Sequence, residues 1–167
     1  MSKPNLVASL TLAFGLWADL AAAVPQSRAQ GVHVAVSPQA IRVVDGDTAR
    51  IHWSATDAET VRILGIDTAE LLGRKGRIPL PVRPHIQPRG AEARGFARGA
   101  FAVATRIELL RSANLDRYGR TLGYFFLDGR NYSVLVIEAG LSRETISHYG
   151  DNDLPREAAE VKAAKHR

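Results

Sequence analysis

The sequence predicts a mainly β protein of the α+β class, in which five strands form a small barrel and about three α-helices pack against it. Short segments with strand-like alternation follow one another and are joined by Asp-Gly turns, which is typical of antiparallel hairpins. The final stretch has the spacing of an amphipathic helix. Because most of the strands are antiparallel, the pattern favours a small closed barrel over a parallel sheet.

The strands are placed by their apolar residues and by the turns between them. The Asp-Gly step at 45–46 is a strong tight-turn signal, because Gly accepts a positive φ and Asp bonds its own backbone. Alternation puts Val61 and Ile63 on one face of their strand and Arg62 on the other. Val32–Val36 alternates more weakly. The five predicted strands are Ile41–Val44, Ala49–Trp53, Thr60–Ile66, Ile107–Leu110 and Thr121–Leu127.

Helices are predicted over Gly90–Ala104, Tyr132–Ala139 and Pro155–Arg167. The second of these is ambiguous, because its Val and Ile residues favour a strand by propensity. Asn131 as a cap and Gly140 at the end favour a short buried helix, which we prefer. In the first helix Gly95 and Gly99 are expected to let the backbone lie close to the sheet. Leu72–Arg89, rich in Pro, Gly and basic residues, is predicted to be a long loop.

The first 29 residues differ from the rest and have the parts of a signal peptide. Lys3 precedes the apolar run Leu6–Trp17, which is too short to span a bilayer comfortably, and small residues follow it. Cleavage after Ala23 or after Ala29 fits this pattern. Asp19 weakens this interpretation, because a charge near the end of the apolar segment opposes insertion. The alternative is an N-terminal helix packed on the domain. We therefore expect an exported monomer, periplasmic or secreted, with no membrane span and one domain over residues 30–167.

The composition favours a globular chain with a basic surface. The 167 residues carry a formal net charge of +5, which attracts polyanions such as nucleic acid but is also compatible with mere solubility. The chain has no cysteine, so disulfides and thiolate metal sites are excluded. The five histidines are dispersed without ligand spacing.

Three clusters of charged residues lie where strands end. They are Asp45-Gly46-Asp47-Thr48, the stretch from Arg62 to Glu70, and Asp116-Arg117-Tyr118-Gly119-Arg120. Each alone could be an ordinary turn, a strand end with solvated acids, or a basic hairpin tip.

Together the three clusters suit phosphodiester hydrolysis. Asp47, Asp67 and a main-chain carbonyl near Thr68 are oxygen ligands of the kind that a hard cation prefers. Glu70 could take a proton from the attacking water. Arginine engages phosphate through its planar fork, and the candidates for this are Arg62 and Arg120. In the third cluster Arg117 and Tyr118 could hold the nucleic-acid chain and a base.

In this order and separation, Asp-Gly-Asp-Thr, Arg-x₄-Asp-Thr-x-Glu and Asp-x-Tyr-Gly-Arg resemble the staphylococcal nuclease (thermonuclease) family over about residues 41–149. The resemblance implies an OB-fold barrel and a calcium-dependent nuclease that acts on DNA and RNA and leaves 3′-phosphates. Matched residue by residue, Asp47, Asp67 and Thr68 would bind Ca²⁺. Arg62 and Arg120 would bind phosphate, and Glu70 would be the general base.

The chain departs from the family pattern in several places. Ala69 stands where the family usually has Pro, and the loop over 71–89 is longer and richer in Pro and Arg. A tyrosine that often flanks the nucleotide is replaced by Ile146 or displaced to Tyr149. The usual apolar Leu-Trp end is missing. The alternative function is a non-catalytic OB-fold module that binds nucleic acid; a protein-interaction barrel has no residue to support it.

Overall fold

A computed structural model describes residues 28–69 and 87–165. Along the chain, a short 3₁₀ helix Pro38–Ala40 joins the first two strands, and the remaining helices follow the first four strands. The strands are β1 (His33–Val36), β2 (Ile41–Asp45), β3 (Thr48–His52), β4 (Ala58–Ile63), β5 (Ile107–Leu115), β6 (Thr121–Leu127) and β7 (Arg130–Asn131). The helices are α1 (Gln87–Val103), α2 (Tyr132–Glu138), α3 (Ile146–Tyr149) and α4 (Pro155–Ala163).

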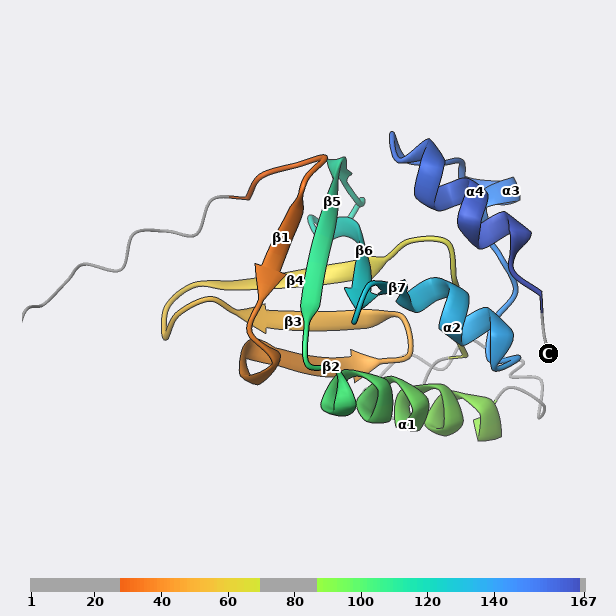
Figure 1. The fold of residues 1–167 in the computed structure, drawn as a ribbon, viewed down its shortest axis with the longest axis horizontal. Helices are drawn as coiled ribbons and strands as arrows, with labels where there is room; N and C mark the ends of the chain where they lie inside the picture. The colour runs from red at the N-terminus through yellow and green to blue at the C-terminus, as the bar shows by residue number, and fades with distance from the viewer. Residues whose placement is uncertain (1–27, 70–86, 166–167) are drawn as a thin grey trace, which may run out of the picture.

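One strongly curved sheet contains all of these strands, in the order β1-β5-β6-β4-β3-β2, with β7 paired to β6 (Figure 1). Every pairing is antiparallel except that of β4 with β6, which run parallel. The mainly β, α+β class is therefore confirmed. The described residues show two additional strands and no pairing that closes the barrel. The two ends of the strand order are β1 and β2, and no pairing between them is present among the described residues, so the predicted closed barrel is not observed.

The local predictions mostly match the observed elements. Residues 132–138 form the predicted short helix, and the side chain of Asn131 caps it by accepting from the Ser133 N–H. The strand predicted to reach Ile66 ends at Ile63, because the chain turns at Gly65, which has a φ of +81°. The last helix ends at Ala163 rather than at the C-terminus. The first 27 residues and most of the predicted loop lie outside the described residues.

The first long helix buries one face but does not confirm the predicted role of its glycines. Ala93, Ala97 and Phe101 are buried, and α1 packs beside β2 (Figure 1). Gly95 and Gly99 instead face outward, and a Cβ built on either would meet no described residue within 4 Å. The glycines therefore do not serve a close approach to the sheet.

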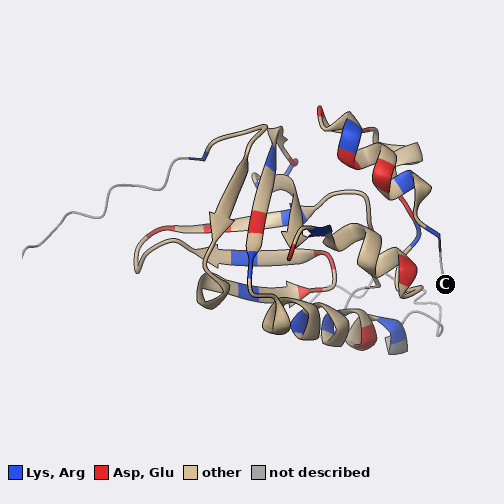
Figure 2. Cartoon of the chain, in the orientation of Figure 1, with Lys and Arg blue, Asp and Glu red and all other residues tan. Residues whose placement is uncertain are grey.

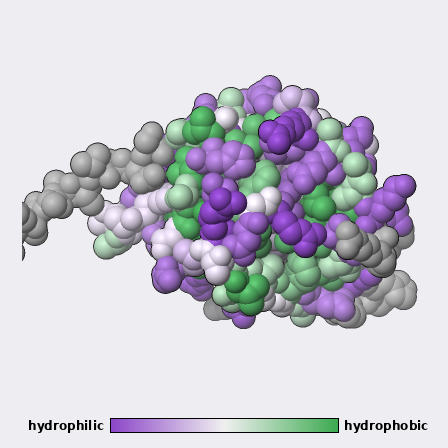
Figure 3. All heavy atoms as spheres, viewed as in Figure 1, coloured by the Kyte–Doolittle hydropathy of each residue, from purple (hydrophilic) through white to green (hydrophobic). Residues whose placement is uncertain are grey.

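The core lies inside the curve of the sheet and extends under the helices. A buried ion pair lies in it: Glu59 on β4 accepts two 2.8 Å hydrogen bonds from Arg111 on β5. Thr121 on β6 and Trp53 also donate to this carboxylate, so its lone pairs are satisfied. On the face seen in Figure 3 hydrophilic side chains predominate and apolar patches are small. Within the described residues, no helix has the length and apolar character needed to cross a bilayer.

Candidate active site

The turn between β2 and β3 holds Asp47 inside the protein. Asp47 is 7% exposed, and its Oδ2 accepts a 2.9 Å hydrogen bond from the Thr68 N–H. Gly46 permits this approach, since a Cβ there would lie 2.6 Å from Thr68 Oγ1 and 2.8 Å from the Cβ of Ala93. The Tyr132 hydroxyl donates to the Gly46 carbonyl at 2.9 Å. Close packing, not a positive φ, therefore explains this glycine.

Arg62, near the end of β4, joins two carboxylates. One of its terminal nitrogens pairs with Asp47, and the other donates to Asp67 Oδ1 at 2.7 Å. The guanidinium also donates to the main-chain carbonyl of Ile66 at 3.2 Å. Val61 is buried and Arg62 is half-buried, as the alternation predicted. A single cation thus lies between the two acids that the sequence singled out.

Asp67 and Thr68 follow the turn after β4 and are held from outside it. Ser142, which follows α2, accepts a 3.0 Å hydrogen bond from the Asp67 N–H and donates to the Asp67 carbonyl at 3.1 Å. The Asp67 side chain is 62% exposed, whereas Thr68 is buried. The sequence reasoning missed Ser142, because no local pattern links it to a residue 75 positions earlier.

The charges at this turn are strongly coupled. Burial and the neighbouring Asp47 raise the pKa of Asp45 to about 6. Burial would also raise the pKa of Asp47, but the positive charge of Arg62 and the Thr68 N–H outweigh it and lower that pKa. Burial would lower the pKa of Arg62, yet the two carboxylates raise it. Arg62 therefore keeps Asp47 ionised, while its neighbour Asp45 binds a proton more readily than an ordinary aspartate.

Arg120 lies just before β6 and is held by Asp116. Its Nε donates to Asp116 Oδ2 at 2.6 Å, and its main-chain N–H donates to Asp116 Oδ1 at 2.8 Å. The Tyr118 N–H donates to the same Oδ1 at 2.8 Å. The guanidinium groups of Arg117 and Arg120 lie over the Tyr118 ring, 4.8 Å and 5.5 Å from its centre. The cluster is thus a built turn with Asp116 at its centre, a role that the sequence reasoning did not assign.

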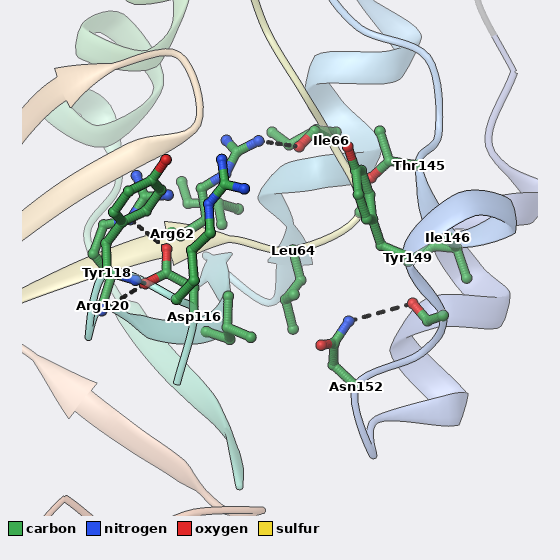
Figure 4. Close-up of a pocket in the computed structure, with 15 residues that line it drawn as sticks. Arg62, Leu64, Ile66, Asp116, Tyr118, Arg120, Thr145, Ile146, Tyr149 and Asn152 are labelled. Carbon is green, nitrogen blue, oxygen red and sulfur yellow. Dashed lines mark hydrogen bonds and ion pairs between the residues drawn. The ribbon is translucent and has the colours of Figure 1, made fainter. Parts of the chain in front are cut away.

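A pocket of about 470 Å³ brings Arg62 and Arg120 together (Figure 4). Arg62 reaches it from β4, and Arg120 reaches it from the position just before β6. These two strands pair in parallel, with Arg62 opposite Leu122. Tyr118, 68% exposed, and Tyr149, 66% exposed, lie on opposite sides of it in Figure 4. Of the two positions considered for the family's nucleotide-flanking tyrosine, Ile146 is buried and Tyr149 is an exposed tyrosine that lines the pocket. The lining residues from outside β4 and β6 are Leu64, Gly65, Ile66, Asp116, Arg117, Tyr118, Arg120, Thr145, Ile146, Tyr149, Gly150 and Asn152.

The described residues contain no group of three His, Asp or Glu side chains placed to hold a metal ion. Glu70, the predicted general base, lies outside them. The donors that are described still suit a hard cation: two carboxylates, from Asp47 and Asp67, and the carbonyl of Thr68. These donors fit a hard divalent cation, with waters needed to complete its coordination.

Comparison with known proteins gives a consistent result. Residues 60–167 match the family described as "Staphylococcal nuclease homologue". The chain is 35% identical over 128 residues to the thermonuclease of Staphylococcus intermedius. The matched region covers 74% of this chain and 69% of that protein. It is 33% identical over 104 residues to the thermonuclease of Staphylococcus hyicus, covering 62% and 56%. It is also 31% identical over 107 residues to the SPbeta prophage-derived endonuclease YokF of Bacillus subtilis, 61% of this chain but 32% of that one.

Proposed function

The chain belongs to the staphylococcal nuclease homologue family, and on that premise we propose that it is a calcium-dependent nuclease that hydrolyses phosphodiester bonds of DNA or RNA and leaves 3′-phosphates. The observation that carries the proposal is the convergence of Arg62 and Arg120 on one pocket beside the Asp47–Asp67 pair. Two arginines and a set of oxygen ligands are what the transition state of phosphate hydrolysis requires.

The arginines would bind the phosphate that is cut. Each presents a planar fork that can engage two phosphate oxygens at once, and the contact strengthens as negative charge grows on those oxygens. Arg120 is available for this contact. Asp116 accepts a hydrogen bond from its Nε, and the described residues offer its terminal nitrogens no hydrogen-bond partner. Arg62 now pairs with two carboxylates, so a phosphate would have to share it with them.

Asp47, Asp67 and the Thr68 carbonyl would hold Ca²⁺, whose charge neutralises a phosphate oxygen. Glu70 would take the proton of the attacking water as its oxygen bonds to phosphorus. The bond from phosphorus to the 5′-oxygen would then break, and the 5′-oxygen would take up a proton from solvent water, which yields a 3′-phosphate and a 5′-hydroxyl. Arg117, Tyr118 and Tyr149 would hold the strand, with the exposed tyrosine rings as stacking surfaces for bases.

The direct test is digestion of plasmid DNA, single-stranded DNA and RNA by the purified protein. We expect cleavage with added calcium, none with a calcium chelator, and 3′-phosphate ends on the products. Glu70→Ala should lower kcat by roughly 10²- to 10⁴-fold, the typical contribution of a positioned acid–base group. Cleavage at an unchanged rate in the presence of the chelator would refute the metal assignment. Binding of nucleic acid without cleavage would favour the non-catalytic module instead.

We further propose that residues 1–29 direct export and that the remaining chain acts as a monomer. The basic start, the short apolar run and the small residues near Ala23 support this. N-terminal sequencing of the protein recovered outside the cytoplasm should find the first residues missing, and light scattering should give the mass of one chain. An intact N-terminus on protein retained in the cytoplasm would contradict the export proposal.

A further inference from the structure

Two exposed arginines extend the positive surface beyond the pocket. Arg42 on β2 and Arg50 on β3 face each other in the strand register, and we call them the distal arginine pair. Both are exposed. Figure 2 shows the corresponding basic segments side by side on β2 and β3, with another on β4. The pair lies outside the residues matched by the family and outside the pocket.

The strand register places the pair on the same face as the pocket arginine. Arg62 is opposite Thr48, and Arg50 is two residues further along β3. Residues two apart on a strand point to the same face, so Arg50 and Arg62 are diagonal neighbours at about 7–8 Å. Arg42 and Arg50, directly opposite, have Cβ atoms about 4.5–5.5 Å apart. Leu122, opposite Arg62 on β6, lines the pocket, which therefore opens on this face.

The distal arginine pair has no anionic partner among the described residues. The ion pairs found there engage other basic residues, whereas Arg42 and Arg50 take part in none. Like charges directly opposite on neighbouring strands destabilise a sheet. Two arginines at directly opposite positions can therefore be bridged by a ligand with repeated negative charges, and arginine is suited to phosphate.

We propose that Arg42 and Arg50 bind consecutive phosphates of a single nucleic-acid strand as it runs from the pocket across β3 and β2. The assignment rests on the proposed nuclease function, because the pocket is what fixes where the strand begins. The contacts are to the backbone, so the pair increases affinity for long strands without reading sequence. A substrate of two nucleotides, held in the pocket, does not reach it.

The test compares Arg42→Gln/Arg50→Gln with Arg156→Gln/Lys165→Gln, which removes the same charge from exposed positions in and just after α4. The affinity of each protein for a 16-nucleotide single-stranded DNA is measured by fluorescence anisotropy in a chelator, from 50 to 300 mM salt. We expect the first variant to bind about tenfold more weakly at low salt. Its plot of log affinity against log salt should be shallower by about 1.4, because each phosphate contact on a single strand contributes about 0.7.

Hydrolysis provides the second readout. KM for the 16-nucleotide strand should rise in the distal-pair variant, while kcat/KM for a dinucleotide stays at the wild-type value. Equal losses in the two variants, or an equal loss on the short and long substrates, would overturn the proposal. So would a loss of binding to phosphatidylserine vesicles with DNA affinity unchanged. If no protein hydrolyses DNA, the nuclease assignment fails, yet the binding and salt measurements still decide whether the pair contacts phosphates.

Discussion

Arg62 and Arg120 reach the same pocket but are held in different ways. Arg62 is half-buried between two aspartates, so its charge already has partners. Arg120 is fixed through Nε by Asp116, which also accepts from the main-chain N–H groups of Tyr118 and Arg120. One carboxylate thus organises both the arginine and the tyrosine of that turn. Asp116 is accordingly a positioning residue that acts through Arg120.

Asp116→Asn tests this role, because it keeps an oxygen acceptor for the two main-chain N–H groups but removes the charge that fixes Arg120. We expect kcat/KM on DNA to fall about tenfold, against roughly 10²–10³-fold for Arg120→Ala, the usual cost of losing one stabilising donor. If Asp116 acts through Arg120, the double variant should be no slower than Arg120→Ala alone. Losses that multiply in the double variant would show that Asp116 acts independently.

At the scale of elements, α1 has two exposed glycines whose replacement by alanine would stabilise the helix. Its buried face is built from small residues and one aromatic, Ala93, Ala97 and Phe101. The opposite face exposes Gly95 and Gly99 in the helix interior, where glycine has more conformational entropy to lose than alanine. Among the described residues, no atom within 4 Å would obstruct a methyl group at either position.

Gly95→Ala/Gly99→Ala should therefore stabilise the protein, by roughly 0.5–1 kcal/mol for each glycine replaced. The free energy of unfolding in urea measures this. Gly65→Ala is the matched control and should destabilise, because Gly65 has a φ of +81° and its Cβ would lie 2.9 Å from Val161 Cγ1. An unchanged or lower stability of the double variant would mean that the exposed helix face has a partner outside the described residues.

At the scale of the whole molecule, Glu59 joins three strands in the core. Its carboxylate, 4% exposed, is bound by Arg111 from β5 and by Thr121 from β6. Burial would raise the pKa of Glu59, but the hydrogen bonds from Arg111, Thr121 and Trp53 outweigh it and lower the pKa below its usual 4.5. The folded state therefore holds this group ionised more strongly than the unfolded state does.

This pKa sets a direction for stability against pH. The contribution of Glu59 is fully present above about pH 4.5, the pKa expected when unfolded, and is lost as the pH falls through the lower folded pKa. Glu59→Gln should cost roughly 3–5 kcal/mol at pH 7, because it leaves the Arg111 charge buried without its counterion. Its unfolding free energy should also depend less on pH below 4.5. Urea unfolding from pH 3 to 7 measures both, with the exposed Glu92→Gln as control, and a variant with the wild-type acid slope would contradict the assignment.

The sequence by itself determined the elements and the set of chemical groups. Apolar alternation predicted the bounds of β2, β3 and β6 to within one residue. Asn131 and Gly140 indicated a helix where propensity favoured a strand. These signals are local, since they depend on residues within a few positions of one another. The order of the acidic and basic clusters can also be read from the sequence alone, and this order is what indicated the family.

Only the tertiary structure decided how those groups meet. The pairing of Arg62 with two aspartates, the tie of Ser142 to Asp67, and the convergence of Arg62 and Arg120 depend on contacts between distant segments. The same holds for the pairing of β1 with β5 and for the exposed glycines of α1. Periodicity says which face of a strand a side chain takes, but the neighbouring strand and its register are fixed by the packing of the whole core.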